Sequence, residues 1–182
     1  MSFVMRSSLM LAAGAAVAGC ALFTEIPSTP LQQAAWQGDI PAIRALVEAG
    51  ANIDAQDDMG GSPLYWAARG GHPVGPHQCR GEAADRPAVI AALLDLGANP
   101  NLPDTRPKGF GRSSGWTPLF VALHHEQFQS AAVMLERGAD PNIRSDQGLS
   151  VMEVAAAEGA PPELIALILA KGFDRQPAHR RQ

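Results

Sequence analysis

The amino-acid sequence predicts an all-α solenoid of about four helix-turn-helix repeats, and two recurring patterns support this prediction. Related segments start 33, 55 and 33 residues apart: TPLQQAAWQGD from Thr29, SPLYWAARGGH from Ser62, TPLFVALHHEQ from Thr117 and SVMEVAAAEGA from Ser150. Each is followed by a related ending: LVEAGANID from Leu46, LLDLGANPN from Leu93, MLERGADPN from Met134 and ILAKGFDRQ from Ile168. Because both motifs recur in phase, a repeat array is favoured over an unrelated bundle of amphipathic helices.

The first helix of each repeat is predicted from its start and from its apolar face. A Thr or Ser hydroxyl caps a helix, and Pro, which follows it in three repeats, is tolerated in the first turn. Apolar and small residues then recur on one helix face, and the alanines among them let neighbouring helices approach closely. These residues are Leu31, Ala34, Ala35, then Leu64, Ala67, Ala68, then Leu119, Ala122 and Leu123.

The second helix of each repeat is predicted from another apolar run, such as Ile43, Leu46 and Val47. A glycine ends each of these runs, as the left-handed residue after a helix requires. The four glycines are Gly50, Gly97, Gly138 and Gly172.

A 33-residue period with these two motifs resembles the ankyrin repeat, from about Thr29 to Asp174. The resemblance implies β-hairpin fingers between the helix pairs and a non-catalytic role in recognising other proteins. The second repeat is 22 residues too long. We assign about 14 of them to a loop near residues 72–86, between its two helices, and about eight to the finger between Asn101 and Gly115.

The residues before the repeats have the features of a targeting segment. The apolar run that ends at Cys20 is shorter than the ~20 residues of a membrane-spanning helix and follows a short basic start. Val17-Ala18-Gly19-Cys20 resembles a bacterial lipobox, in which the cysteine thiol is acylated. Alternatives are an ordinary signal peptide and a buried N-terminal helix, and Met5 is an alternative start to Met1.

The lipobox resemblance implies a domain organisation and a location. Residues 1–19 are a cleaved lipoprotein signal peptide, residues 20–28 a lipidated cysteine and tether, residues 29–174 the ankyrin-repeat domain and residues 175–182 a basic tail. Acyl chains such as palmitate anchor the protein in a membrane. Since Ala rather than Asp follows the cysteine, we expect a bacterial outer-membrane lipoprotein that faces the periplasm.

Catalytic and cofactor motifs are not found in the sequence. It has no phosphate-binding glycine loop, no HExxH and no GxSxG, so we expect no enzyme activity and no cofactor. With a net charge of −4, the chain also lacks the basic field that favours nucleic acid. His77 and Cys79 are candidate metal ligands near His72, but a surface loop is favoured, and Cys79 has a redox role as a further alternative.

Candidate protein-binding residues follow from the repeat register. In ankyrin repeats, the two residues after the Ala-Ala pair and the finger tips face the concave surface. The candidates are Trp36, Gln37, Asp58, Met59, Arg69, Trp116, His124, His125, Asp146, Gln147 and Glu158. Tryptophan, arginine and histidine in a row have the composition of a binding hot spot. Shielding of Trp36 by the tether, and a pH-sensitive or metal-binding His124–His125 pair, are alternatives. Trp66 is expected to pack between repeats.

The partner itself is open at this stage. We expect a monomer that binds another protein of the envelope, as a scaffold, an assembly factor or a protective factor. An immunity protein that neutralises a toxin, and an accessory factor for a haem catalase, are the alternatives. The last helix, Glu163 to Gly172, is apolar nearly all round. A poor cap is favoured over a tail that folds back on it or a contact with a partner.

Overall fold

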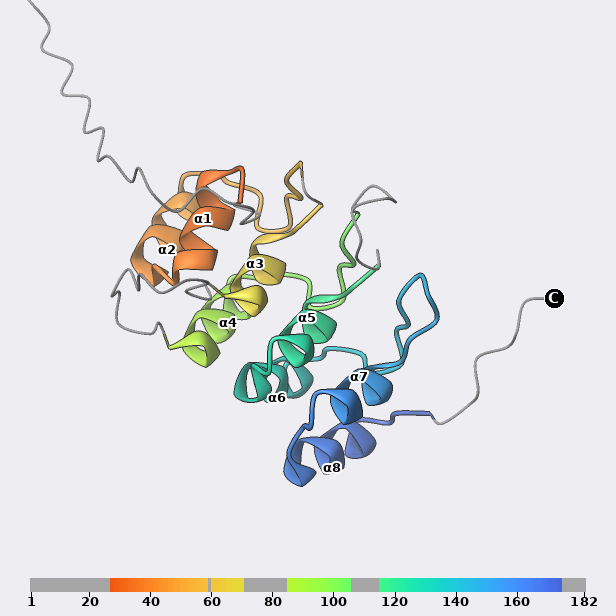
Figure 1. Ribbon diagram of the computed structural model, residues 1–182. Coiled ribbons are helices and arrows are strands. Elements are labelled where there is room, and N and C mark those ends of the chain that lie inside the picture. Colours follow the sequence, from red (N-terminus) through yellow and green to blue (C-terminus); the bar gives the residue numbers. More distant parts are fainter. Residues whose placement is uncertain (1–26, 59, 71–84, 106–114, 175–182) are drawn as a thin grey trace, which may run out of the picture.

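The computed structural model describes residues 27–58, 60–70, 85–105 and 115–174, and this part of the chain contains eight helices. They form four pairs, with α1, α3, α5 and α7 in an inner row beside the projecting loops and the others in an outer row (Figure 1). This confirms the predicted all-α solenoid. The helices are α1 (Pro30–Gln37), α2 (Ile40–Glu48), α3 (Pro63–Arg69), α4 (Arg86–Asp95), α5 (Pro118–His124), α6 (Phe128–Glu136), α7 (Val151–Ala157) and α8 (Pro162–Ala170).

The inner helices begin at the expected Thr and Ser caps. The hydroxyl of Ser62 accepts a hydrogen bond from Tyr65 N at 3.1 Å, and that of Thr29 accepts one from Gln32 N at 3.4 Å. Ser150 forms a capping box with Glu153, in which each side chain accepts a bond from the other residue's backbone N–H. These bonds satisfy amide groups that the first helical turn leaves unpaired.

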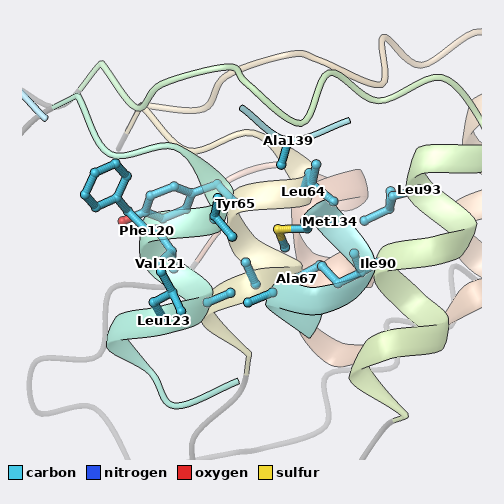
Figure 2. Packing of buried hydrophobic residues seen from close by; sticks show 14 of the residues in the cluster. Leu64, Tyr65, Ala67, Ile90, Leu93, Phe120, Val121, Leu123, Met134 and Ala139 are labelled. Carbon is cyan, nitrogen blue, oxygen red and sulfur yellow. The ribbon is translucent and has the colours of Figure 1, made fainter. Parts of the chain in front are cut away.

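The hydrophobic core runs through the whole stack between the two rows of helices. Figure 2 shows Leu64, Ile90, Leu93 and Met134 packed together, and all four are fully buried. Small residues lie between the inner helices, as expected, because a large side chain would hold neighbouring helices apart. These small residues are Ala35, Ala67, Ala68, Ala122 and Ala155.

The fingers are tied across their bases by a repeated pair of hydrogen bonds. In each finger, the backbone N–H of a base residue donates to the backbone oxygen of the residue just before the helix cap. The backbone N–H of that second residue donates back to a side-chain oxygen of the base residue. The pairs are Asp57–Gly61, Asp104–Trp116 and Ser145–Leu149. The described residues form no β-strand, and an antiparallel bridge joins Arg144 to Ser150. The first and third fingers are hydrogen-bonded loops, because only three residues lie between their paired positions and leave no room for a ladder.

The surplus of the second repeat lies where the sequence places it. Paired base positions are four residues apart in the first and third fingers but twelve apart in the second, between Asp104 and Trp116. Two residues separate α1 from α2, whereas residues 70–85 separate α3 from α4. Residues 71–84 and 106–114 themselves lie outside the described part of the chain.

Consecutive repeats are joined by a ladder of side-chain acceptors. An Asp or Asn after each outer helix accepts a bond from a backbone N–H of the next repeat. The three bonds run from Asn99 N to Asp54 Oδ1 (2.8 Å), from Asp140 N to Asn101 Oδ1 (2.8 Å) and from Asp174 N to Asn142 Oδ1 (2.7 Å). Since the donor always belongs to the following repeat, the ladder sets the register of the stack.

Within the described residues, no helix has the length and apolarity needed to cross a membrane.

Candidate protein-binding surface

The candidate site is the surface along the inner helices, from the fingers that precede their N-terminal ends to the residues at their C-terminal ends, and it is called here the inner surface. Trp36 and Gln37 lie in the last turn of α1, and Arg69 and His124 end α3 and α5. Because inner helices pack side by side in chain order, these residues lie at the same end of consecutive helices (Figure 1). Gln37 is exposed, and the other three are partly buried.

In the N-terminal part of the inner surface, Arg86 of α4 binds the C-terminal end of α1. Its Nη1 donates to the backbone oxygen of Trp36 at 2.7 Å, at the C-terminal end of α1. Burial lowers the pKa of this guanidinium, which nevertheless stays charged at ordinary pH. A cation at a helix C-terminus is favourable because unpaired carbonyl groups carry partial negative charge there. Arg86 thereby fixes the end of the helix that carries Trp36.

In the middle of the inner surface, Arg69 lies over an aromatic ring. Its guanidinium carbon is 5.2 Å from the ring centroid of Trp66, within the range of a cation–π interaction. Trp66 is fully buried, as expected, and its indole Nε1 donates to Asp57 Oδ2 at 2.8 Å. The tryptophan therefore connects the first finger to the surface position of Arg69.

The C-terminal part of the inner surface is a cluster that crosses from the third repeat to the fourth. The imidazole Nδ1 of His124 is 2.7 Å from Glu158 Oε1. The rings of Trp116 and His125 lie 5.0 and 5.3 Å from the His124 ring, both edge-on. Phe120 extends the cluster beneath Trp116, with ring centroids 6.1 Å apart. The structure thus brings together four of the predicted binding residues, Trp116, His124, His125 and Glu158.

Two indoles near the inner surface have opposite hydrogen-bonding states. The Nε1 of Trp66 is bonded to Asp57, whereas the buried Nε1 of Trp116 has no hydrogen-bond partner among the described residues. An unpaired buried donor costs about 1–3 kcal/mol. The backbone of Trp116 is fixed by its bonds to Asp104, and its indole contacts the rings of Phe120 and His124.

The finger tips contribute acidic and polar groups. Asp58, Asp146 and Gln147 are exposed, and the Asp146 carboxylate lies against Gly115, where an added Cβ would be 2.6 Å from Oδ1. The remaining predicted site residues, Cys20, Met59, His77 and Cys79, lie outside the described part of the chain. In the described part, no group of three His, Cys, Asp or Glu residues could hold a metal ion.

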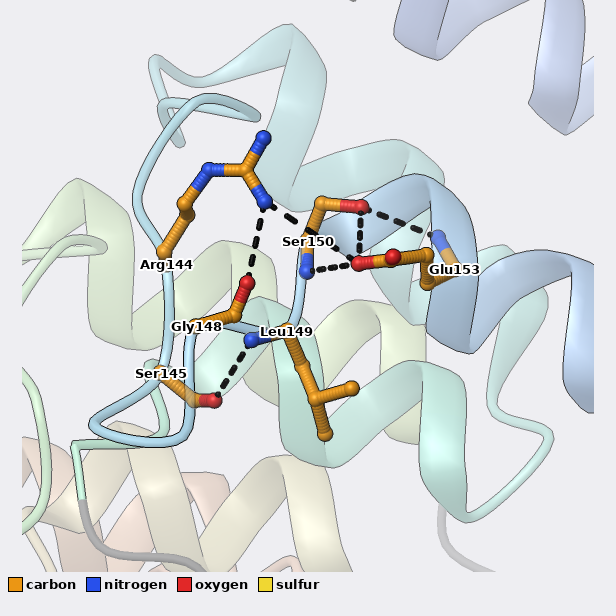
Figure 3. A network of polar contacts seen from close by, with 6 residues as sticks. All are labelled: Arg144, Ser145, Gly148, Leu149, Ser150 and Glu153. Carbon is orange, nitrogen blue, oxygen red and sulfur yellow. Dashed lines mark hydrogen bonds and ion pairs between the residues drawn. The ribbon is translucent and has the colours of Figure 1, made fainter. Parts of the chain in front are cut away.

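A network of polar contacts surrounds the base of the third finger, on the C-terminal side of the inner surface (Figure 3). Arg144 Nη1 donates to Gly148 O at 2.9 Å and lies 4.0 Å from Glu153 Oε2. The backbone N–H and the hydroxyl of Ser150 both donate to this carboxylate oxygen, at 2.7 Å. The Ser150 bonds, and then the Arg144 charge, lower the pKa of Glu153.

Sequence reasoning missed the two residues that support the surface from inside, Arg86 and Phe120. Arg86 stands at the position of Ile40 in the first repeat, so a cation at an apolar register position was the available signal. Phe120 has the position of Gln32, and only its neighbours in space show that it lies under Trp116.

Comparisons with known proteins identify the repeats. The family model for ankyrin repeats in many copies matches residues 31–75, and the model for the single ankyrin repeat matches residues 114–146. Together with the helical stack, these matches show that the fold is an ankyrin-repeat solenoid.

Several curated proteins resemble the chain. Ankyrin repeat protein nuc-2 of Neurospora crassa is 31% identical over 71% of this chain and 10% of its own length. The ADP-ribosylation factor GTPase-activating protein AGD4 of Arabidopsis thaliana is 36% identical over 46% of this chain and 10% of its own. The E3 ubiquitin-protein ligase KEG of the same plant is 30% identical over 70% of this chain and 7% of its own. The chain thus spans a tenth or less of these relatives.

Ankyrin repeats act in general as interaction modules without catalytic activity, and they imply a protein partner.

Proposed function

We propose that the protein binds another protein through its inner surface and has no catalytic activity of its own. The observation that carries the proposal is the cluster of Trp116, His124, His125 and Glu158 at the junction of the last two repeats. Partly exposed aromatic and basic side chains held by neighbours are typical of binding hot spots, because little side-chain entropy is lost on binding. Trp36 and Arg69 extend this composition along the same face.

The support from inside distinguishes this surface from the outer row of helices. Arg69 lies on Trp66, His124 on Glu158, and the Trp36 carbonyl on Arg86. The outer helices instead present exposed charged residues, such as Arg44 and Glu136, to solvent, and an ion pair joins Arg137 after α6 to Asp95 of α4. Because the side chains of the inner surface are held in place and those of the outer row are solvated, the inner surface is the better candidate for the binding site.

Affinity capture from an envelope extract, followed by binding measurements with the purified captured protein, tests the proposal. A triple variant, Trp36→Ala, Arg69→Ala and His124→Ala, should lose binding. A second variant places arginine at Gln37 and Gln147, which are exposed, so that charge changes without loss of a buried contact.

The matched control changes the outer row, with Arg44→Ala, Gln129→Ala and Glu136→Ala, which are exposed positions of α2 and α6. Circular dichroism and thermal melting show that each variant remains folded. Equal affinity of the inner-surface variants and the control would exclude the inner surface as the binding site.

The location of the protein is a further part of the proposal and rests on the lipobox resemblance. Acylation at Cys20 would hold the repeat domain at a bacterial outer membrane, facing the periplasm. Metabolic labelling with a palmitate analogue should mark the wild-type protein and not Cys20→Ser. Labelling that persists in Cys20→Ser would rule out this anchor, without bearing on the inner surface.

A further inference from the structure

A polar hollow of about 470 Å³ lies at the C-terminal end of the row of fingers. One wall is the base of the third finger, and the other is the short loop that follows α8. The residues that line it are Asn142, Arg144, Ser150, Gly172, Phe173 and Asp174. The hollow is therefore found where the described part of the row of fingers ends.

The repeat register relates this hollow to a place earlier in the stack. Positions are counted from the glycine that ends each outer helix and from the cap of each inner helix. The lining residues then correspond to Asp54, Gln56, Ser62, Gly97, Ala98 and Asn99 around the first finger. At that earlier place, the chain itself fills the space.

The segment that fills the earlier place is the first part of the second finger. Gln56 Nε2 donates to Pro103 O at 2.7 Å, and Thr105 N donates to Gly60 O at 3.2 Å. The second and third fingers also lie against each other at these positions, since Asp146, at the position of Thr105, lies beside Gly115, at that of Gly60. The second finger is thus bound to the first by one side chain and one backbone carbonyl of the first finger.

The third finger has the groups needed to bind a following finger as the first finger binds the second. Gln56 also bonds Gly60 O within its own finger, at 3.1 Å, and Arg144 at the corresponding position bonds Gly148 O at 2.9 Å. A guanidinium has five N–H donors, so it can bond a second carbonyl as Gln56 bonds that of Pro103.

We propose that the hollow is the docking site of the chain's own residues 175–182, as the first part of a fourth finger. The chain continues from Asp174, which is part of the wall. Ala178 and Arg180 follow Asp174 at the same spacing as Pro103 and Thr105 follow Asn99. Among the lining residues, Asp174 is complementary in charge to Arg175, Arg180 and Arg181 of the segment, and the positive charge of Arg144 lies 4.0 Å from Glu153.

This docking protects the exposed end of the finger row. Unpaired backbone groups at such an edge otherwise invite pairing with another chain. It leaves the inner surface open to a partner, so it is independent of the proposed function.

Amide hydrogen exchange of the full-length protein, followed by NMR, tests the proposal. The corresponding bond from Thr105 N to Gly60 O predicts that Arg180 N donates to Gly148 O. The Arg180 amide should exchange at least about tenfold more slowly than in a random coil, and the Gln182 amide at the random-coil rate. Exchange of Arg180 at the random-coil rate would overturn the proposal.

Matched proline variants exclude an indirect effect on folding. Arg180→Pro removes the donor and should shift the Gly148 and Leu149 resonances, whereas Gln182→Pro should leave them unchanged. Arg144→Ala should speed exchange of the Arg180 amide, and Arg44→Ala, on the outer row, should not. Equal spectra for the two proline variants, or a dimer in light scattering that Arg144→Ala dissociates, would each contradict docking of the chain's own terminus.

Discussion

The indole of Trp66 folds over Gly61 and donates its hydrogen bond to Asp57, so that an added Cβ on Gly61 would lie 2.5 Å from Nε1. In the third and fourth repeats, the larger side chain stands before the helix cap, at the position of Gly61, and the smaller one stands on the helix, at the position of Trp66. Trp116 precedes the cap of the third repeat and Val121 stands on its helix, and the fourth repeat has Leu149 and Val154. The larger of the two side chains thus covers the start of α3, α5 and α7, and it stands on the helix in α3 but before the cap in α5 and α7.

Gly61→Ala should destabilise the protein by about 1–3 kcal/mol, because the buried indole must move. In a Trp66→Val background, which imitates the third and fourth repeats, the same substitution should cost little. Urea unfolding of the double-mutant cycle measures the coupling, expected at about 0.5–3 kcal/mol for residues in contact. Additive effects of the two substitutions would show that the size allowed at position 61 does not depend on the side chain at position 66.

Asp54→Asn should stabilise the protein by about 0.5–1.5 kcal/mol, the net value of one hydrogen bond. Asn101 and Asn142 accept a backbone N–H and also donate their amide to Gly138 O and Gly172 O. The Asp54 carboxylate accepts but cannot donate to Gly97 O. Thermal melting checks this expectation, with Asn101→Asp as the reverse control, which should lower the melting temperature.

Glu126→Gly should also stabilise the protein. Glu126 has φ 55°, while the first and fourth repeats have Gly38 and Gly159 at this turn. The left-handed conformation costs an L-residue about 1–2 kcal/mol, and glycine loses about 0.4–1 kcal/mol in unfolded-state entropy, so the net gain is about 0.5–1 kcal/mol. Gly38→Ala is the control, and unfolding in urea should show it to be destabilised.

Glu153→Gln should reduce stability at neutral pH and lose this effect in acid. The pKa of Glu153 lies below its ordinary value of 4.5, because Ser150 donates two bonds to it. The ionised carboxylate therefore contributes stability above pH 4.5, which is lost as the pH falls through the depressed pKa. Unfolding free energies of both proteins from pH 7 downward should converge in acid, and a constant difference would contradict this origin.

Arg86→Ala should cost about 1–3 kcal/mol, because it removes a charged donor from the end of α1. Amide exchange in the turn at Gly38 should become faster, since that turn follows the Trp36 carbonyl. Arg44→Ala, an exposed arginine of α2, is the control and should stay within about 0.5 kcal/mol of wild type in the same unfolding measurement.

Local signals were sufficient for the predicted fold. A Thr or Ser cap, an apolar helix face and a closing glycine each depend on a few neighbouring residues, and their recurrence identified all four helix pairs. Even the surplus of eight residues in the second finger was assigned correctly, because Asp104 and Trp116 keep their places in the register. Among the described residues the fingers contain no β-strand, because side-chain acceptors at Asp57 and Ser145 close the short first and third loops.

The sequence by itself determined which residues occupy the inner surface, because that follows from their position in the repeat. Only the tertiary structure decided which of them act together. His124 and Glu158 are 34 residues apart, and Arg86 reaches Trp36 across 50, so no local pattern contains either contact. Side chains at equal register positions differ in length and charge, and their pairing depends on how closely the alanine-lined helices stack.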